Sequence, residues 1–153
     1  MKKDRQGFTL VEVLVAVIII ATVVVGMIEL FIYSTMLSES TRNLTSAFMD
    51  AQSKMEEIRN HTYSLITTDY ASGGTPGNTF DLSTLTGKGV IYIDSSNSSL
   101  LQITIVVCWE NSRTGRIIGE DLDLDGTLDA GEDLDSDSQI DSPAKLISYI
   151  AYR

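Results

Sequence analysis

The sequence predicts an α+β protein, in which a long N-terminal α-helix packs on a C-terminal antiparallel β-sheet. Apolar side chains recur at helical spacing, without any proline, over residues 8–60. Short runs of β-branched and aromatic residues with alternating polarity begin at residue 89. An acidic segment at residues 120–143 interrupts these runs and predicts a calcium-binding loop inserted in the last β-hairpin.

Residues 8–33 form the apolar half of the predicted helix. The sixteen residues between Glu12 and Glu29 carry no charge, and with their flanks they reach the roughly 20 apolar residues that span a bilayer as a helix. Three basic residues precede this segment: Lys2, Lys3 and Arg5. The positive-inside rule then places the N-terminus in the cytoplasm. We therefore expect a single-pass protein of the cytoplasmic (inner) membrane, with everything after residue 33 outside.

Glu12 lies inside this apolar segment, where an ionisable side chain costs about 2.5–3.5 kcal/mol and needs a partner. A cleaved secretory signal has a shorter apolar region that ends in small residues, and a plain signal anchor leaves Glu12 unexplained. The run around it is Gly7-Phe8-Thr9-Leu10-Val11-Glu12-Val13-Leu14. This run resembles the processing motif of type IV prepilins and of the pseudopilins of type II secretion.

This resemblance implies how the chain is processed and assembled. Prepilin peptidase, a membrane enzyme, would cut between Gly7 and Phe8, remove residues 1–7 as a leader peptide and methylate Phe8. Glu12 would neutralise the terminal amine of a neighbouring subunit, so that other pilins or pseudopilins are partners through the N-terminal helix. The physics agrees, because a carboxylate and an ammonium that are buried together offset each other's desolvation.

Residues 34–60 continue the helix as an amphipathic half. Apolar side chains lie three, four or seven residues apart on one face: Leu37, Leu44, Phe48, Ala51, Met55 and Ile58. Charged residues lie between them, which predicts a solvated opposite face. The apolar stripe therefore predicts packing against the domain that follows. Gly26 is the expected weak point of the whole helix, because an interior glycine costs about 1 kcal/mol relative to alanine.

Residues 61–153 predict a β domain. The Gly-, Ser- and Thr-rich residues 67–88 predict a long surface loop with little regular structure. Strands are expected at residues 89–94, 101–109, 116–119 and 146–152, with a turn over 95–99. The odd-numbered residues from Leu101 to Trp109 are all apolar, which predicts that this face of the sheet packs on the helix.

The predicted strands include the runs I-T-I-V-V-C-W-E, the basic turn R-T-G-R and the closing L-I-S-Y-I-A-Y-R. These runs resemble the last strands of the V-type minor pilins of type IV pili and of the I-type minor pseudopilins. This second resemblance implies a pilin-like fold for the whole chain.

The acidic segment contains the pattern of an EF-hand calcium loop, D-x-D-x-D-G-x5-E. Carboxylates at alternate positions converge on one hard cation, Gly126 permits the sharp turn, and the last glutamate binds with both oxygens. The ligands of this first site are Asp121, Asp123, Asp125, Thr127 (through its backbone carbonyl), Asp129 and Glu132. A second, overlapping frame lacks the glycine and the glutamate and offers Asp133, Asp135, Asp137, Gln139 and Asp141. We expect one structural Ca²⁺, or two if the second frame also binds.

The acidic segment also explains the net charge of −10. Residues 120–141 hold ten of the 21 acids and no base, so 11 acids and 11 bases remain in the rest of the chain. The charge therefore describes a metal site, and a chain without a basic excess is not expected to bind nucleic acid. Without metal, the repulsion between these carboxylates predicts a disordered segment.

The chain has one cysteine and one histidine. Cys108 alone excludes an internal disulfide, and His61 alone excludes a multi-histidine zinc site. Cys108 lies in a β-patterned run, which predicts a packed thiol, and His61 is expected at the surface. No nucleophile motif accompanies His61, so we expect no catalytic activity.

Together these features predict a structural subunit, of the minor class, of a type IV pilus or a type II secretion pseudopilus. The alternative is a single-span, calcium-binding cell-surface sensor or adhesin that does not polymerise. The two hypotheses differ first in whether the chain is cut after Gly7.

Overall fold

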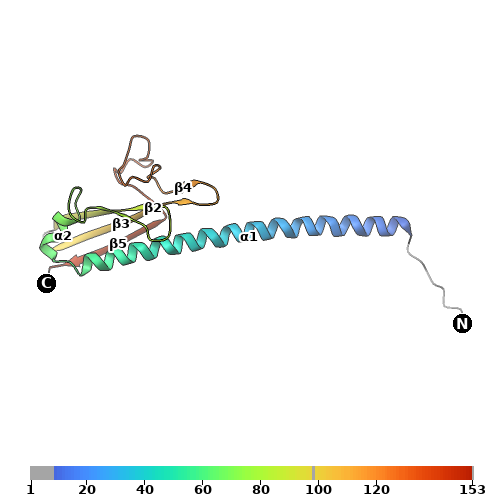
Figure 1. Cartoon of the computed structure of the whole chain (residues 1–153), viewed down its shortest axis with the longest axis horizontal. Coiled ribbons are helices and arrows are strands. Elements are labelled where there is room, and N and C mark those ends of the chain that lie inside the picture. Colours follow the sequence, from blue (N-terminus) through green and yellow to red (C-terminus); the bar gives the residue numbers. More distant parts are fainter. Residues whose placement is uncertain (1–8, 98, 153) are drawn as a thin grey trace. The chain divides into compact units, whose positions relative to one another are not determined.

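The computed structural model describes residues 9–97 and 99–152, which form two helices and five strands (Figure 1). The elements are α1 (Leu10–Arg59), α2 (Tyr63–Asp69), β1 (Thr79–Asp81), β2 (Gly87–Asn97), β3 (Leu100–Asn111), β4 (Arg116–Ile118) and β5 (Ala144–Ala151). The long N-terminal helix and the antiparallel sheet confirm the predicted α+β, pilin-like arrangement.

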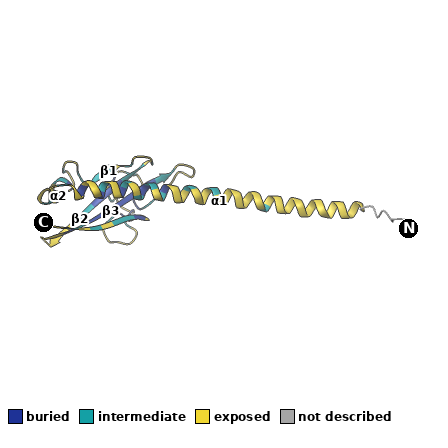
Figure 2. Cartoon of the chain, turned by 90° about the horizontal axis from the view of Figure 1, so that it is seen from below, coloured by how far each residue is buried: buried dark blue, intermediate teal, exposed yellow. Residues whose placement is uncertain are grey.

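Helix α1 belongs to both of the compact units into which the chain divides, with the boundary between Glu39 and Ser40. At its start the hydroxyl of Thr9 accepts a hydrogen bond from the backbone N–H of Glu12 at 3.2 Å, which satisfies one of the free amides of the first turn. The helix continues through Gly26 without a break. In the first unit its apolar side chains are exposed (Figure 2), and by length and composition the helix can cross a membrane.

Strand β3 is central in the sheet, and all pairings are antiparallel. Strand β2 pairs with one edge of β3, and β1 adds to β2. Strands β4 and β5 both lie on the other edge of β3, where Trp109 pairs with Ile118 and Val107 pairs with Ala144. The chain therefore leaves this edge of β3 after β4 and returns to it at β5. Strand β4 pairs with the part of β3 after Cys108, and β5 pairs with the part before it. The acidic segment is an insertion in the returning strand of the last hairpin.

The main core lies between the sheet and the part of α1 in the second unit. The helix contributes the fully buried side chains of Ala47, Ala51, Met55 and Ile58. Strand β3 contributes the predicted face, Leu101, Ile103, Ile105, Val107 and Trp109. Full burial of a Met, Ile, Leu or Val side chain stabilises a fold by about 1.5–3 kcal/mol. The predicted packing of the apolar stripe is thus confirmed for its C-terminal part, while Leu37 lies in the first unit and is exposed.

A second apolar cluster covers the opposite face of the sheet. It joins Val90, Val106 and Cys108 of the strands to Ile140 of the insertion, and all four are buried. Leu124 and Leu128 of the insertion pack against them. Strand β3 is therefore buried on both faces from Ile103 to Trp109, whereas the sequence predicted only the helix-facing side. The insertion supplies the missing cover.

Burial raises the pKa of the Cys108 thiol to about 11. The side chain is 1 % exposed, so the thiol is protonated at neutral pH and shielded from reagents. The expected packed cysteine is confirmed.

Three expectations are wrong in detail. The loop predicted over residues 67–88 contains the end of α2, all of β1 and the start of β2. Strand β1 forms there because β2 offers its free edge for antiparallel pairing. The turn predicted over 95–99 begins later, since β2 continues to Asn97. His61 is half-buried: its Nε2 lies 2.8 Å from Oδ2 of Asp69, and its ring meets that of Tyr70 edge-on at 5.3 Å.

Candidate functional site

Glu120, whose side chain is largely buried, joins the beginning of the acidic insertion to its end. Its backbone N–H donates to the carbonyl of Asp141 at 2.9 Å. Its carboxylate accepts from the N–H of Asp141 at 2.9 Å and from the N–H of Leu134 at 3.2 Å. Gly119, just before it, has φ +116°, and a Cβ there would lie 2.3 Å from Sγ of Cys108. The path of the chain into the insertion therefore requires glycine at this position.

Asp121 opens the first predicted calcium frame and is fully buried. Its carboxylate accepts hydrogen bonds from the N–H of Gly126 at 2.9 Å and of Asp125 at 3.1 Å. Gly126 has φ +85°, and a Cβ on it would lie 2.7 Å from the side chain of Thr79 in β1. The sharp turn that the sequence pattern predicts is thus present, and it rests on the sheet.

Glu132 closes the first frame from the other end. Its Oε1 accepts the N–H of Leu122 at 2.7 Å, and its Oε2 accepts the N–H of Asp129 at 2.9 Å. The side chain is 6 % exposed. Both ends of the twelve-residue frame are therefore tied together by its first and last carboxylates.

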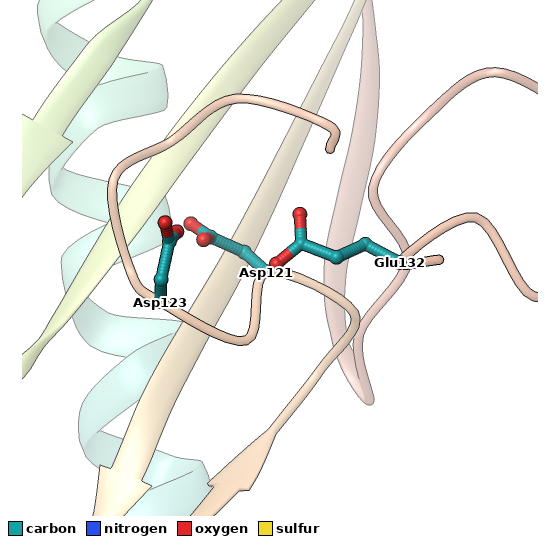
Figure 3. A group of neighbouring side chains, drawn as sticks. All are labelled: Asp121, Asp123 and Glu132. Carbon is teal, nitrogen blue, oxygen red and sulfur yellow. The ribbon is translucent and has the colours of Figure 1, made fainter. Parts of the chain in front are cut away.

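The acids of the first frame converge in two overlapping groups. Asp121, Asp123 and Glu132 form one group, and Figure 3 shows their side chains approaching one another from different parts of the loop. Asp123 also forms the second group with Asp125 and Asp129. Within each group one carboxylate oxygen per residue lies within 4.8 Å of the others. Each of the five predicted acidic ligands of this frame therefore belongs to one of two groups that share Asp123. Thr127 lies beside Asp125, to which its N–H and hydroxyl donate hydrogen bonds.

Electrostatics within this frame disfavour the metal-free, fully ionised state. Burial raises the pKa of Asp121, and the nearby negative charge of Glu132 raises it further, although hydrogen bonds from Gly126 and Asp125 act in the opposite direction. By contrast, the hydrogen bonds from Thr127 lower the pKa of Asp125. A buried carboxylate next to a second one is unfavourable without a counter-charge, and a divalent cation would supply that charge.

The second frame is only partly assembled. Asp133, Asp135 and Asp137 form a third group of converging carboxylates. Among the residues that the structure describes, the buried Oδ1 of Asp133 has no hydrogen-bond partner. The carboxylate of Asp141 instead forms an ion pair with Lys145 at 2.5 Å, and Gln139 contacts the group through its backbone N–H, which donates to Asp137.

The predicted processing and assembly residues lie at the other end of the chain. Gly7 and Phe8 fall outside the described residues. Glu12 lies in the first turn of α1, where a negative charge is favourable because the N–H groups of a helix start point toward it. Its side chain is exposed. Glu12 therefore lies at the start of the apolar helix, and its role in assembly stays a prediction.

Two features of the insertion were missed by sequence reasoning. One is the closing role of Glu120, which in the sequence is only one of ten acids in the segment. The other is the apolar underside formed by Leu124, Leu128 and Ile140. The signal was present in the sequence, since leucines and an isoleucine recur within a segment that is otherwise acidic.

Comparison with known proteins bears on the N-terminal end. Residues 2–28 match the family model described as the prokaryotic N-terminal methylation motif. No curated protein and no solved structure matches the chain. The motif indicates a prepilin substrate of the type IV pilin or pseudopilin kind, which implies processing by prepilin peptidase and assembly with other pilins. Together with the apolar N-terminal helix, it fits anchoring in the inner membrane.

Proposed function

We propose that this protein is a structural subunit, of the minor class, of a type IV pilus or a type II secretion pseudopilus. The observation that carries this proposal is the methylation motif over residues 2–28, which overlaps the start of a 50-residue helix. The apolar part of α1 anchors the subunit in the membrane before assembly and contributes to the core of the filament afterwards. The role is structural, and no catalytic step is assigned to it.

Cleavage after Gly7 prepares the chain for assembly by creating a new terminal amine on Phe8. In the filament Glu12 of one subunit neutralises the amine of its neighbour, since either charge alone is unfavourable among apolar helices. Thr9 holds the backbone of Glu12 in the first helical turn. The helix start thus places Glu12 near the beginning of the apolar segment.

The insertion has a separate role in this proposal: one Ca²⁺ in the first frame holds residues 120–143 folded against the sheet, and the second frame is a weaker candidate for a second ion. The support is the EF-hand spacing together with the convergence of Asp121, Asp123 and Glu132. Sites on extracellular modules often bind calcium at about 10⁻⁴–10⁻³ M, which suits a constitutive structural ion. Both ends of the insertion join strands of the same sheet, so the ion stabilises a cover instead of moving helices.

Fractionation of cells tests this function against the single-span sensor or adhesin. In cells that have prepilin peptidase, the filament fraction (sheared pili or overproduced pseudopili) should contain the shortened protein. In cells lacking the peptidase, the full-length chain should remain in the inner membrane. A full-length protein that stays in the inner membrane in both strains would support the sensor or adhesin and contradict the filament role.

A further inference from the structure

The two acidic frames of the insertion adopt the same loop conformation. Each opens with an aspartate whose Oδ2 accepts the N–H of the sixth residue. In the first frame, Asp121 accepts from Gly126 at 2.9 Å. In the second frame, Asp133 accepts from Ser138 at 3.2 Å. The sixth residue has a positive φ in both frames, +85° in Gly126 and +63° in Ser138. The second frame thus folds like the first, although it lacks the glycine.

The two frames differ where they close. In the first frame both carboxylate oxygens of Glu132 accept hydrogen bonds from the loop. The equivalent position of the second frame is Ala144, which begins β5 and is fully buried. The second frame therefore lacks the bidentate ligand of a calcium loop. The residue that follows Ala144 is a base, Lys145.

The ammonium group of Lys145 faces the acids of the second frame. Its Nζ lies 2.5 Å from Oδ1 of Asp141, which occupies the ninth position of the frame. The hydrogen bond to Asp141 raises the pKa of Lys145 although partial burial opposes the rise, and the charges of Asp137 and Asp135 raise it further. One ammonium group therefore lies in the field of three carboxylates, unlike the lone surface ion pairs that contribute little to stability.

This ammonium group leaves one oxygen of the frame unsatisfied. Among the residues that the structure describes, the buried Oδ1 of Asp133 has no hydrogen-bond partner. In the first frame the corresponding Oδ1 of Asp121 accepts the N–H of Asp125. Carboxylate oxygens of Asp133, Asp135 and Asp137 lie within 4.8 Å of one another. The frame thus keeps converging oxygens while its charge is partly balanced by a base of the chain itself.

We propose that Lys145 is the resident cation of the second frame and thereby restricts the insertion to one Ca²⁺. This inference rests on the proposed calcium role of the insertion and specifies its stoichiometry. A divalent ion that entered the second frame would be repelled by the ammonium group at short range. It would also have to displace Lys145 from Asp141 to gain that ligand. The residue that determines the metal content therefore lies in β5, outside the acidic segment.

Counting the calcium ions bound to the full chain in detergent tests this inference. Equilibrium dialysis with radioactive calcium should find one ion per chain in the unmodified protein and two in Lys145→Gln. The second frame of K145Q should bind calcium about tenfold or more tightly than that of the unmodified protein, because a nearby like charge has been removed. Lys145→Arg keeps the charge and should bind one ion. Lys54→Gln, which removes a lysine paired with Glu57 on α1, is the matched control and should also bind one.

A further substitution locates the additional ion. In K145Q/D137N the second ion should be lost, whereas the first should bind as in the unmodified protein, which shows that the insertion remains folded. Two ions in the unmodified protein, or no additional ion in K145Q, would overturn the inference. An unmodified protein that binds no calcium, with one ion in K145Q that D137N removes, would contradict the proposed calcium role of the first frame and still support the role of Lys145.

Discussion

Replacing Glu12 with alanine should lower incorporation of the protein into filaments by roughly 10² to 4 × 10³-fold. The physical reason is that removing one partner of a buried ion pair leaves the other charge uncompensated, at a cost of about 3–5 kcal/mol, and each 1.4 kcal/mol corresponds to a factor of ten. The amount of protein in the filament fraction, compared with that in the membrane, measures the effect. The thermal unfolding of the C-terminal unit should not change, because Glu12 lies in the other unit.

The glutamine variant separates this role from helix capping. Glu12 is the third residue of α1, with its N–H bonded to Thr9, and a glutamine at this position can still serve in a capping box. Glu12→Gln should therefore be as defective as Glu12→Ala if the charge is needed for assembly. Val13→Ala, a neighbouring change without charge, serves as the matched control. Normal incorporation of the glutamine variant would show that the carboxylate only caps the helix.

Calcium should raise the unfolding temperature of the protein in detergent by about 10 °C, and Asp121→Asn should abolish this rise. At a calcium concentration 100 times the dissociation constant, binding stabilises the folded state by about 2.7 kcal/mol, and 1 kcal/mol shifts the midpoint by roughly 4 °C in a domain of this size. Thermal unfolding with Ca²⁺ and with a chelator provides the measurement. Asp94→Asn, which changes an exposed acid outside the insertion, is the matched control.

The chelator condition distinguishes a metal ligand from a purely structural aspartate. Burial raises the pKa of Asp121 in the folded state. Ionisation of Asp121 therefore destabilises the folded protein once the pH exceeds the pKa of the carboxyl in the unfolded chain, and a neutral asparagine avoids that loss. In chelator Asp121→Asn should therefore unfold at or above the temperature of the unmodified protein. A decrease that is equal with and without calcium would mean that Asp121 serves only as an acceptor for Gly126 and Asp125.

The accessibility of the Cys108 thiol tests whether calcium holds the insertion against the sheet. The insertion buries this thiol together with Val106 and Ile140, so labelling by a maleimide should be slow while calcium holds the insertion in place. Removal of calcium should accelerate labelling of the unmodified protein as the insertion detaches, whereas labelling of Asp121→Asn should not depend on calcium. Equal protection with and without calcium would show that the apolar cluster alone holds the insertion in place.

The sequence was most informative where the deciding interactions are local. Helical spacing was sufficient to predict the buried face formed by Ala51, Met55 and Ile58, because these residues share one side of a single helix. The EF-hand spacing likewise predicted the meeting of Asp121 and Glu132, since a twelve-residue loop closes on its own ends. In both cases the contacts depend on few residues other than those in the pattern.

Contacts between distant segments could not be predicted in the same way. The packing of Ile140 on Val90 and Cys108 joins segments far apart in the chain, and it depends on the path that the insertion takes after Gly119. Asp141 was assigned to the second calcium frame from its spacing, but that path places it beside Lys145. Patterns within a short stretch of sequence predict a loop and its ligands. The surface against which the loop packs depends on the sheet, whose residues lie far away in the chain.

The central claim is that the chain is a prepilin, and mass spectrometry of the N-terminal peptide of the protein purified from its own cells tests it most directly. The predicted result is a mature chain that lacks residues 1–7 and begins with N-methylated Phe8. A chain that retains residues before Phe8, or that begins at another position, would contradict the claim.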